Sequence, residues 1–222
     1  MFKTETHMHT KEGSSCGMLT AEEIVREYHK AGFHTLCISN HFGAQFFRPW
    51  GEMNWEETIE RFMLGYRLAK AEGERLGMNI LFSAEIEFDE PLGQHYLVYG
   101  IDEEFLKAYP KLHQMPLAEF YELAKEKGIL VIQAHPYRDN DENPNVTPEL
   151  VDGFEVRNPN PRHVPYDEHA EATAAEFGLY RTAGSDAHRT GDVARTAMCS
   201  EEEIKTVEDY IALVKSGKAV LL

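Results

Sequence analysis

The sequence has little that would place the protein in a membrane or cross-link it by disulfides. Its apolar runs stay well short of the roughly 18 residues that a membrane-spanning helix needs. The opening segment MFKTETHMHT lacks the apolar core of a secretory signal. The three cysteines, Cys16, Cys37 and Cys199, are odd in number and show no paired spacing, which disfavours a disulfide framework. We therefore expect a cytoplasmic protein with no membrane partner.

Basic residues are also scarce relative to acidic ones. The chain has 22 Lys and Arg residues against 38 Asp and Glu residues, which gives a formal net charge of −16. This charge would repel a long nucleic acid, so we expect none as a partner. A small anionic ligand stays compatible with the charge, because bound divalent cations reverse its sign locally.

No Pro/Gly/Ser-rich linker or internal repeat divides the 222 residues, so we predict a single domain over residues 1–222. Strand-like runs alternate with helical segments. The runs are continuously apolar, which is typical of a parallel sheet covered on both faces by helices and predicts an α/β fold. The predicted strands are 1–10, 35–39, 79–84, 95–99, 129–134, 153–156, 179–183 and 195–199, and the predicted helices are 20–32, 55–76, 117–127, 166–177 and 201–215.

Histidine and carboxylate side chains recur where the strand-like runs end. Barrels of the (β/α) type build their active sites at the carboxyl ends of their strands. Alternate residues of a strand point the same way, so His7 and His9 would aim at one point. Imidazole together with carboxylate suits zinc, manganese or iron. The sequence therefore predicts a metal site, and the candidate ligands at strand ends are His7, His9, His41, Glu85, His135, Asp186 and His188.

Six short motifs span nearly the whole chain. They are HMHT at 7–10, NHF at 40–42, AEIEF at 84–88, QHYLVYG at 94–100, AHPYR at 134–138 and GSDAH at 184–188. In their order and spacing the chain resembles the PHP family, the polymerase and histidinol phosphatase domain of metal-dependent phosphoesterases. The resemblance implies a distorted (β/α)7 barrel, similar to a TIM barrel, which holds two or three divalent ions (Zn, Mn or Fe) and hydrolyses phosphoesters.

The resemblance also distributes the ligands among the ions. It implies that one ion is held by His7, His9, Glu85 and Asp186. It implies that a second ion is held in part by His41 and His188, and a third by His95, His135 and a bridging Glu85.

The chain departs from the family pattern at two places. The family often has an aspartate or histidine in the first loop, where this chain has Ser15-Cys16-Gly17, and Glu12 is the nearest replacement ligand. Asn40 stands where an aspartate often precedes the histidine, and its amide would orient His41 by a hydrogen bond without adding charge. Glu87, two residues after Glu85, is an alternative ligand at that strand end.

The chemistry that these residues imply is hydrolysis of a phosphoester, most readily a phosphomonoester. A hydroxide that bridges the metal ions would be the nucleophile, and the ions would neutralise charge on the phosphoryl oxygens. We expect Asp186 and Glu85 to be catalytic, together with Arg138, which would grip the phosphate of a small phosphorylated substrate. Further candidates for substrate binding are Arg157, Arg162 and His163, for which a structural or solvated role is the alternative.

Two other functions stay open. An amidohydrolase would use a similar barrel, but such enzymes commonly have a bridging lysine at a strand end, and no predicted strand here ends in one. A metal-binding regulatory module without catalytic activity would be favoured if Asn40 and the altered first loop have removed an ion. The oligomeric state is not predicted.

The sequence also allows predictions for an aromatic loop and for the histidines outside the ligand set. The aromatic loop covers the site, stacks on a base or ring of a ligand, or packs against the next helix; its aromatic residues are Phe42, Phe46, Phe47 and Trp50. The remaining histidines are expected at the surface, on helices or helix ends; they are His29, His34, His113 and His169.

Overall fold

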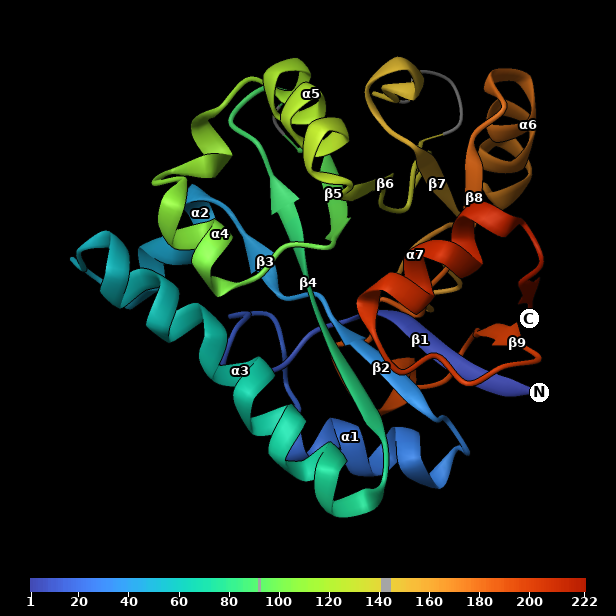
Figure 1. Cartoon of the computed structure of the whole chain (residues 1–222), viewed down its shortest axis with the longest axis horizontal. Coiled ribbons are helices and arrows are strands. Elements are labelled where there is room, and N and C mark those ends of the chain that lie inside the picture. The colour runs from blue at the N-terminus through green and yellow to red at the C-terminus, as the bar shows by residue number, and fades with distance from the viewer. Residues whose placement is uncertain (92, 141–144) are drawn as a thin grey trace.

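A computed structural model describes residues 1–91, 93–140 and 145–222 of the chain. Its strands form one mixed sheet that curls into a nearly closed barrel with helices around it (Figure 1). The strands are β1 (Phe2–Met8), β2 (Thr35–Ile38), β3 (His41–Phe42), β4 (Asn79–Glu87), β5 (His95–Tyr99), β6 (Leu130–Gln133), β7 (Gly153–Arg157), β8 (Tyr180–Ala183), β9 (Met198–Ser200) and β10 (Val220–Leu221). Their order in the sheet is β10-β9-β1-β2-β4-β5-β6-β7-β8, and β3 pairs with β4.

The barrel closes between β1 and the chain that follows β8. Met8 and Ala187 form a parallel bridge there. Thr6 Oγ1 donates a hydrogen bond to the carbonyl oxygen of Ala183 at 2.8 Å. The predicted α/β barrel is thereby confirmed.

The prediction of a wholly parallel sheet was wrong at two places. β5 runs antiparallel to both β4 and β6, and β9 runs antiparallel to β1. The connection 88–94 between β4 and β5 is too short for a parallel return, which takes about a dozen residues or more. As a consequence the first residue of β5, His95, pairs with Glu87 near the end of β4 and lies at the same edge of the sheet as the carboxyl ends of the parallel strands.

Capping signals set the helix boundaries. The helices are α1 (Ala21–Lys30), α2 (Ala44–Phe47), α3 (Trp55–Leu76), α4 (Glu103–Ala108), α5 (Leu117–Lys127), α6 (Asp167–Phe177) and α7 (Val207–Ser216), with 3-10 turns at Arg48–Trp50, Leu112–Gln114, Pro148–Leu150 and Thr190–Asp192. Thr20 and Glu23 form the predicted capping box of α1. The last helix begins later than predicted because Thr206 and Asp209 form its capping box, and the preceding strand is Met198–Ser200 rather than 195–199.

The inner face of the barrel changes from apolar to polar toward the carboxyl ends of the parallel strands. In β4, Leu81 belongs to an apolar cluster that includes Tyr210 and Val214 of α7. At every second position after it come Ser83, Glu85 and Glu87, all buried. One end of the barrel is therefore packed with apolar side chains under α7, and the other end is lined by polar ones.

One histidine lies elsewhere than expected. The prediction of a surface position for His113 was wrong, because only 4% of its surface is exposed. Its ring packs among Phe42, Phe47 and Trp55, with centroid distances of 6.0, 5.6 and 6.4 Å. The aromatic rings of the loop after β3 thus enclose an imidazole that the sequence pattern gave no reason to bury.

In the described parts of the chain no helix has both the length and the apolar character required to cross a membrane.

Candidate metal centre

Four side chains from three parts of the chain converge at the polar end of the barrel. They are His7 in β1, His9 just after it, Glu85 in β4 and Asp186 after β8. His9 Nε2 lies 3.2 Å from His7 Nε2 and 3.0 Å from Asp186 Oδ1. His7 Nε2 lies 3.3 Å from both Glu85 Oε1 and Asp186 Oδ1, and His9 Nε2 lies 3.3 Å from Glu85 Oε2. One ligand atom from each of the four residues lies within 4.8 Å of the others, so the four residues offer ligand atoms to one shared ion, for which Zn–N and Zn–O bonds are usually about 2.0 to 2.2 Å.

The backbone around this group is adapted to the convergence. Gly184 lets the chain after β8 approach β1, since a Cβ there would lie 2.4 Å from Glu155 Oε1 and 2.4 Å from His7 Cβ. Two candidate ligands, Asp186 and His135, have positive φ angles of 49° and 31°. Non-glycine residues rarely adopt such angles, and they gather at functional sites where the surrounding structure enforces them.

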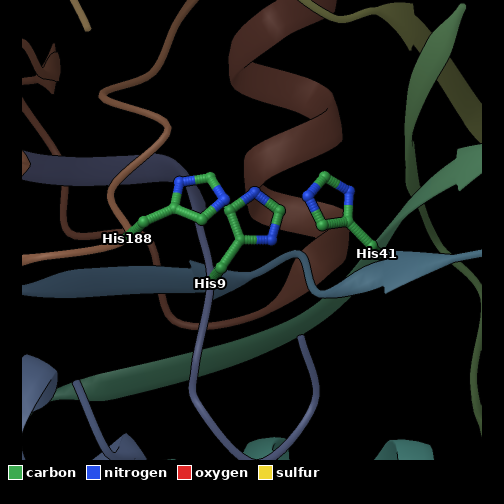
Figure 2. Close-up of side chains that lie close together, drawn as sticks. All are labelled: His9, His41 and His188. Carbon is green, nitrogen blue, oxygen red and sulfur yellow. The ribbon is translucent and has the colours of Figure 1, made fainter. Parts of the chain in front are cut away.

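A second group consists of three histidines whose rings pack together, His9 stacking on each of the other two. Figure 2 shows His9 between His41 and His188. The ring centroids are 4.2 Å apart for His9 and His41 and 4.3 Å apart for His9 and His188. All three side chains are buried. His9 therefore belongs to two of the three groups that the described residues form.

The third group is centred on Glu85. His41 and His95 complete it, and His95 Nδ1 and His135 Nε2 lie 3.1 and 2.9 Å from Glu85 Oε1. His41 Nδ1 and Glu85 Oε2 lie 2.6 Å apart without the angles of a hydrogen bond, so in the described residues both are buried and unpartnered. Buried polar atoms are otherwise nearly always paired. Two orphaned ligand atoms facing each other are what a shared cation would satisfy, so the donor set fits divalent metal ions.

Further polar contacts fix the ligand rings from behind. His7 Nδ1 lies 3.0 Å from Glu155 Oε1, and His9 Nδ1 lies 3.3 Å from Ser14 Oγ. His188 Nδ1 lies 2.9 Å from the carbonyl oxygen of Asp186. Such contacts set the tautomer and orientation of metal-binding imidazoles.

Ionisation of the two carboxyl groups matches a ligand role. Burial acts to raise the pKa of Glu85, but the charges of His41 and His7 outweigh it and hold that pKa well below its ordinary value. Burial acts in the same direction on Asp186, where His7 and Arg138 hold the pKa well below its ordinary value. Both groups are therefore ionised at neutral pH.

The histidines divide into two classes. Burial lowers the pKa of His9 well below its ordinary value, and burial with the charge of Arg138 lowers the pKa of His135 to about 3. Burial also acts to lower the pKa of His7, but the carboxylates of Glu155 and Glu85 outweigh it and raise that pKa well above its ordinary value. Because a metal ligand must be the neutral imidazole, binding of an ion would displace a proton from His7.

Of the predicted substrate-binding residues, Arg138 lies closest to this cluster. Its guanidinium pairs with Asp186, and its Nη2 donates to Asn158 Oδ1 at 3.1 Å. Arg138 also lines a cavity of about 260 Å³ together with His95 and His135. A larger cavity, of about 740 Å³, lies elsewhere, between Met1 and α7.

The other candidates take different positions. Arg162 Nη2 lies 3.2 Å from His188 Nδ1 and 3.1 Å from Asp192 Oδ2, so it contacts the cluster through a histidine. His163 Nδ1 lies 2.6 Å from Asp139 Oδ2, and it lines a small pocket beside Arg138. Arg157 is exposed at the end of β7.

Three acidic or amide residues considered as ligands or ligand supports are engaged elsewhere. Glu12 accepts a hydrogen bond from the backbone N–H of Ala21 at 2.9 Å and belongs to none of the three groups. Glu87 pairs with Gln45 and lies 3.8 Å from His95 Nε2, behind that ring. Asn40 Oδ1 accepts hydrogen bonds from Thr10 N–H at 2.8 Å and from Ser14 Oγ at 3.2 Å. Its amide therefore shapes the first loop.

Comparison with known protein families matches part of the chain, including the motif GSDAH at 184–188. Residues 167–219 match a family model, PHP_C, that is described as PHP-associated. Among curated protein sequences none matches this chain.

Solved structures share the fold of the whole chain. A two-domain protein from Bacteroides vulgatus, which contains a predicted PHP-like metal-dependent phosphoesterase, aligns with a TM-score of 0.68 and 17% identity over 100% of this chain and 64% of its own. A lesion-specific endonuclease from Pyrococcus furiosus aligns with a TM-score of 0.62 and 16% identity over 99% of this chain and 57% of its own. An amidohydrolase from Chromobacterium violaceum, with bound sulfate and no metal, aligns with a TM-score of 0.57 and 14% identity over 99% of this chain and 97% of its own. The chain thus spans less than two thirds of the first two proteins.

Proposed function

We propose that the chain is a metal-dependent hydrolase of phosphoesters, most readily of phosphomonoesters, which the match of residues 167–219 to a PHP-associated family model and the fold shared with a PHP-like protein support. The observation that carries the proposal is the convergence of His7, His9, Glu85 and Asp186 at the polar end of the barrel, where the Nε2 atom of each histidine lies 3.0 to 3.3 Å from both carboxylates. The proposal assigns residues 1–222 to one phosphoesterase domain of the PHP type.

The proposed cofactor is a set of two or three divalent ions, with zinc, manganese and iron as the candidates that this ligand chemistry suits. Three groups of ligand atoms support this number, and they share His9, His41 and Glu85. When bound, such ions supply a nucleophilic water at neutral pH and neutralise charge on phosphoryl oxygens.

The chain's own residues would bind the cations and the phosphate group of the substrate. Glu85 and Asp186 contribute the negative charge that holds cations in a buried site. Arg138 is the proposed phosphate grip, because its guanidinium reaches both Asp186 and the cavity of about 260 Å³. A planar guanidinium matches two phosphate oxygens at once.

The proposed substrate is small. The cavity of about 260 Å³ lies just below the usual range for small-molecule sites, roughly 300 to 1,000 Å³. The net charge of −16 disfavours a long polyanion. The endonuclease among the structural neighbours makes phosphodiesters the next class to test.

The test is phosphate release from a panel of phosphomonoesters by the Mn- and Zn-loaded protein. Asp186→Asn removes one ligand charge, and Glu171→Gln makes the same kind of change in an exposed pair with Arg181. We expect release by the wild type and by Glu171→Gln and none by Asp186→Asn. Equal release by all three proteins would contradict the assigned site. If the wild type hydrolyses no monoester but cleaves diesters, phosphodiesters become the proposed substrate class. If it hydrolyses neither, a metal-binding module without catalytic activity is favoured.

A further inference from the structure

The short helix α2 places an aromatic side chain directly on one of the candidate ligands. The ring of Phe46 stacks on the ring of His41 with centroids 4.1 Å apart and planes 6° apart. His9 stacks on His41 as well, with centroids 4.2 Å apart. Two rings that both stack this closely on one imidazole must lie on its opposite faces. His41 is therefore sandwiched between Phe46 and His9.

His9 also contacts His188, with ring centroids 4.3 Å apart. Because His41 and His188 are themselves only 5.8 Å apart, the three imidazoles form a compact triangle, with Phe46 packed on the His41 corner at 4.1 Å. The three histidines are one of the candidate ligand groups, and Figure 2 shows them side by side. Phe46 packs against this group and carries no ligand atom itself.

His41 differs from its neighbours in what orients it. The Nδ1 atoms of His7, His9 and His188 each have a polar partner that fixes the ring. For His41, Nδ1 is instead the nitrogen that faces another candidate ligand: it lies 2.6 Å from Glu85 Oε2, and in residues 1–91, 93–140 and 145–222 neither atom has a hydrogen-bond partner. Besides the contact with Glu85, the orientation of the His41 ring is therefore set by packing on its two faces.

Two local features seat α2 above the ligands. Gly43 allows close approach to β4, since a Cβ there would lie 3.0 Å from the carbonyl oxygen of Glu87. Gln45 contacts the carboxylate of Glu87. Phe46 N–H donates to the carbonyl oxygen of Gly43 at 3.1 Å, which turns the chain back over His41.

Phe46 differs from the other aromatic residues of its loop. Phe42, Phe47 and Trp50 pack in the apolar cluster with Trp55, as the packing alternative for this loop predicted. Phe46 is half-buried, and besides His41 its ring meets His95 at 6.0 Å. Its contacts are thus with the candidate metal ligands.

We propose that Phe46 is a positioning residue that orients the His41 imidazole for metal binding by ring stacking, in place of the hydrogen bond that usually orients such a ligand. This inference rests on the proposed metal-dependent function. Contacts behind a ligand are typically worth about 10 to 100-fold in metal affinity. Aromatic stacking belongs at the lower end of that range.

The test measures metal binding itself, by calorimetric titration with Mn²⁺ and by the absorption spectrum of the Co²⁺-loaded protein. Phe46→Leu and Phe46→Met remove the ring, and Phe46→Tyr keeps it. Phe47→Leu is the matched control, because it removes a neighbouring ring that packs in the apolar cluster.

We expect Phe46→Leu and Phe46→Met to bind one ion, one that His41 would hold, about tenfold less tightly than the wild type, with an altered Co²⁺ spectrum and a nearly unchanged thermal midpoint without metal. Phe46→Tyr should restore the affinity and the spectrum. Phe47→Leu should lower the thermal midpoint and leave the metal affinity unchanged.

Failure of the inference is distinguishable from failure of the proposed function. If the wild type binds metal and both ring-removing variants bind it equally well, the role of Phe46 is refuted and the proposed function stands. Equal weakening by Phe47→Leu would refute the role too, since the effect would then be general to the loop. A wild type that binds no divalent ion would refute both.

Discussion

Glu85 is the side chain whose loss should disturb the centre most. Its carboxylate oxygens lie 3.3 Å from His7 and His9, 2.6 Å from His41, 3.1 Å from His95 and 2.9 Å from His135. It belongs to two of the ligand groups, whereas Asp186 belongs to one. Glu85→Gln keeps the size of the side chain and removes its charge, so it should weaken ions in both groups.

The size of the effect follows from linkage between metal binding and folding. At a free metal concentration 1,000 times the Kd, one bound ion stabilises the folded state by about 4.1 kcal/mol. If Glu85→Gln weakens that ion about a hundredfold, the stabilisation falls by about 2.7 kcal/mol. A chain of 222 residues shifts its unfolding midpoint by roughly 2 to 4 °C per kcal/mol, which makes the expected loss about 5 to 11 °C.

The assay compares thermal unfolding in EDTA with unfolding at increasing Mn²⁺ or Zn²⁺. Glu87→Gln is the control, because Glu87 lies two residues along the same strand face and belongs to no ligand group. Glu87→Gln should keep most of the metal-dependent rise in midpoint, and Glu85→Gln should lose it. The reasoning is refuted if Glu85→Gln shows the same metal-dependent rise as the wild type.

Three further predictions concern other parts of the account. Arg138→Lys should raise the KM for a phosphomonoester about tenfold or more while metal affinity stays the same, because an ammonium group lacks the planar fork; steady-state kinetics with a metal titration tests this, and an unchanged KM would remove Arg138 from substrate binding. Gly184→Ala should lower the free energy of unfolding in urea by roughly 1 to 3 kcal/mol, because the new Cβ meets His7 and Glu155. A variant as stable as the wild type would contradict the close approach of the backbone at Gly184 to these two side chains. Burial lowers the pKa of His113, with Asp89 opposing and Lys111 adding to the shift. Because the unfolded chain then binds a proton more readily than the folded one, folding stability should fall as the pH drops below about 6.5, by at most about 1.4 kcal/mol per pH unit. In His113→Phe this pH-dependent loss of folding stability should be absent when urea unfolding is measured at a series of pH values below about 6.5. An identical pH profile in the wild type and the variant would show that His113 does not titrate on unfolding.

Local patterns predicted the elements well where capping residues mark them. The bounds of α3 and α5 match the prediction, and both helices end at glycines in the left-handed conformation, Gly77 and Gly128. Strand direction was the feature that apolar runs did not reveal. A continuous apolar run is equally compatible with either direction once both faces of the strand are buried.

The candidate site was likewise predicted in part from local sequence patterns. The structure brings together the histidines and carboxylates that follow strand-like runs, because the carboxyl ends of parallel strands share one edge of the barrel. His95 reaches this edge only because β5 is antiparallel, and in a parallel strand its first residue would have lain at the opposite edge. Ser14 contacts the His9 ring through its hydroxyl oxygen, and the ring of Phe46 stacks on that of His41. No sequence spacing pointed to those contacts. Glu12 was predicted only as the nearest replacement for a ligand of the resembled family, and its carboxylate instead accepts a hydrogen bond from the backbone N–H of Ala21.

Metal content per chain tests the central claim most directly. The protein would be stripped with a chelator, loaded with Mn²⁺ or Zn²⁺, freed of excess ion and measured by elemental analysis beside Asp186→Asn. The account predicts two or three ions per wild-type chain, as three ligand groups allow, and fewer in the variant. Fewer than one ion per wild-type chain, or the same content in both proteins, would contradict it.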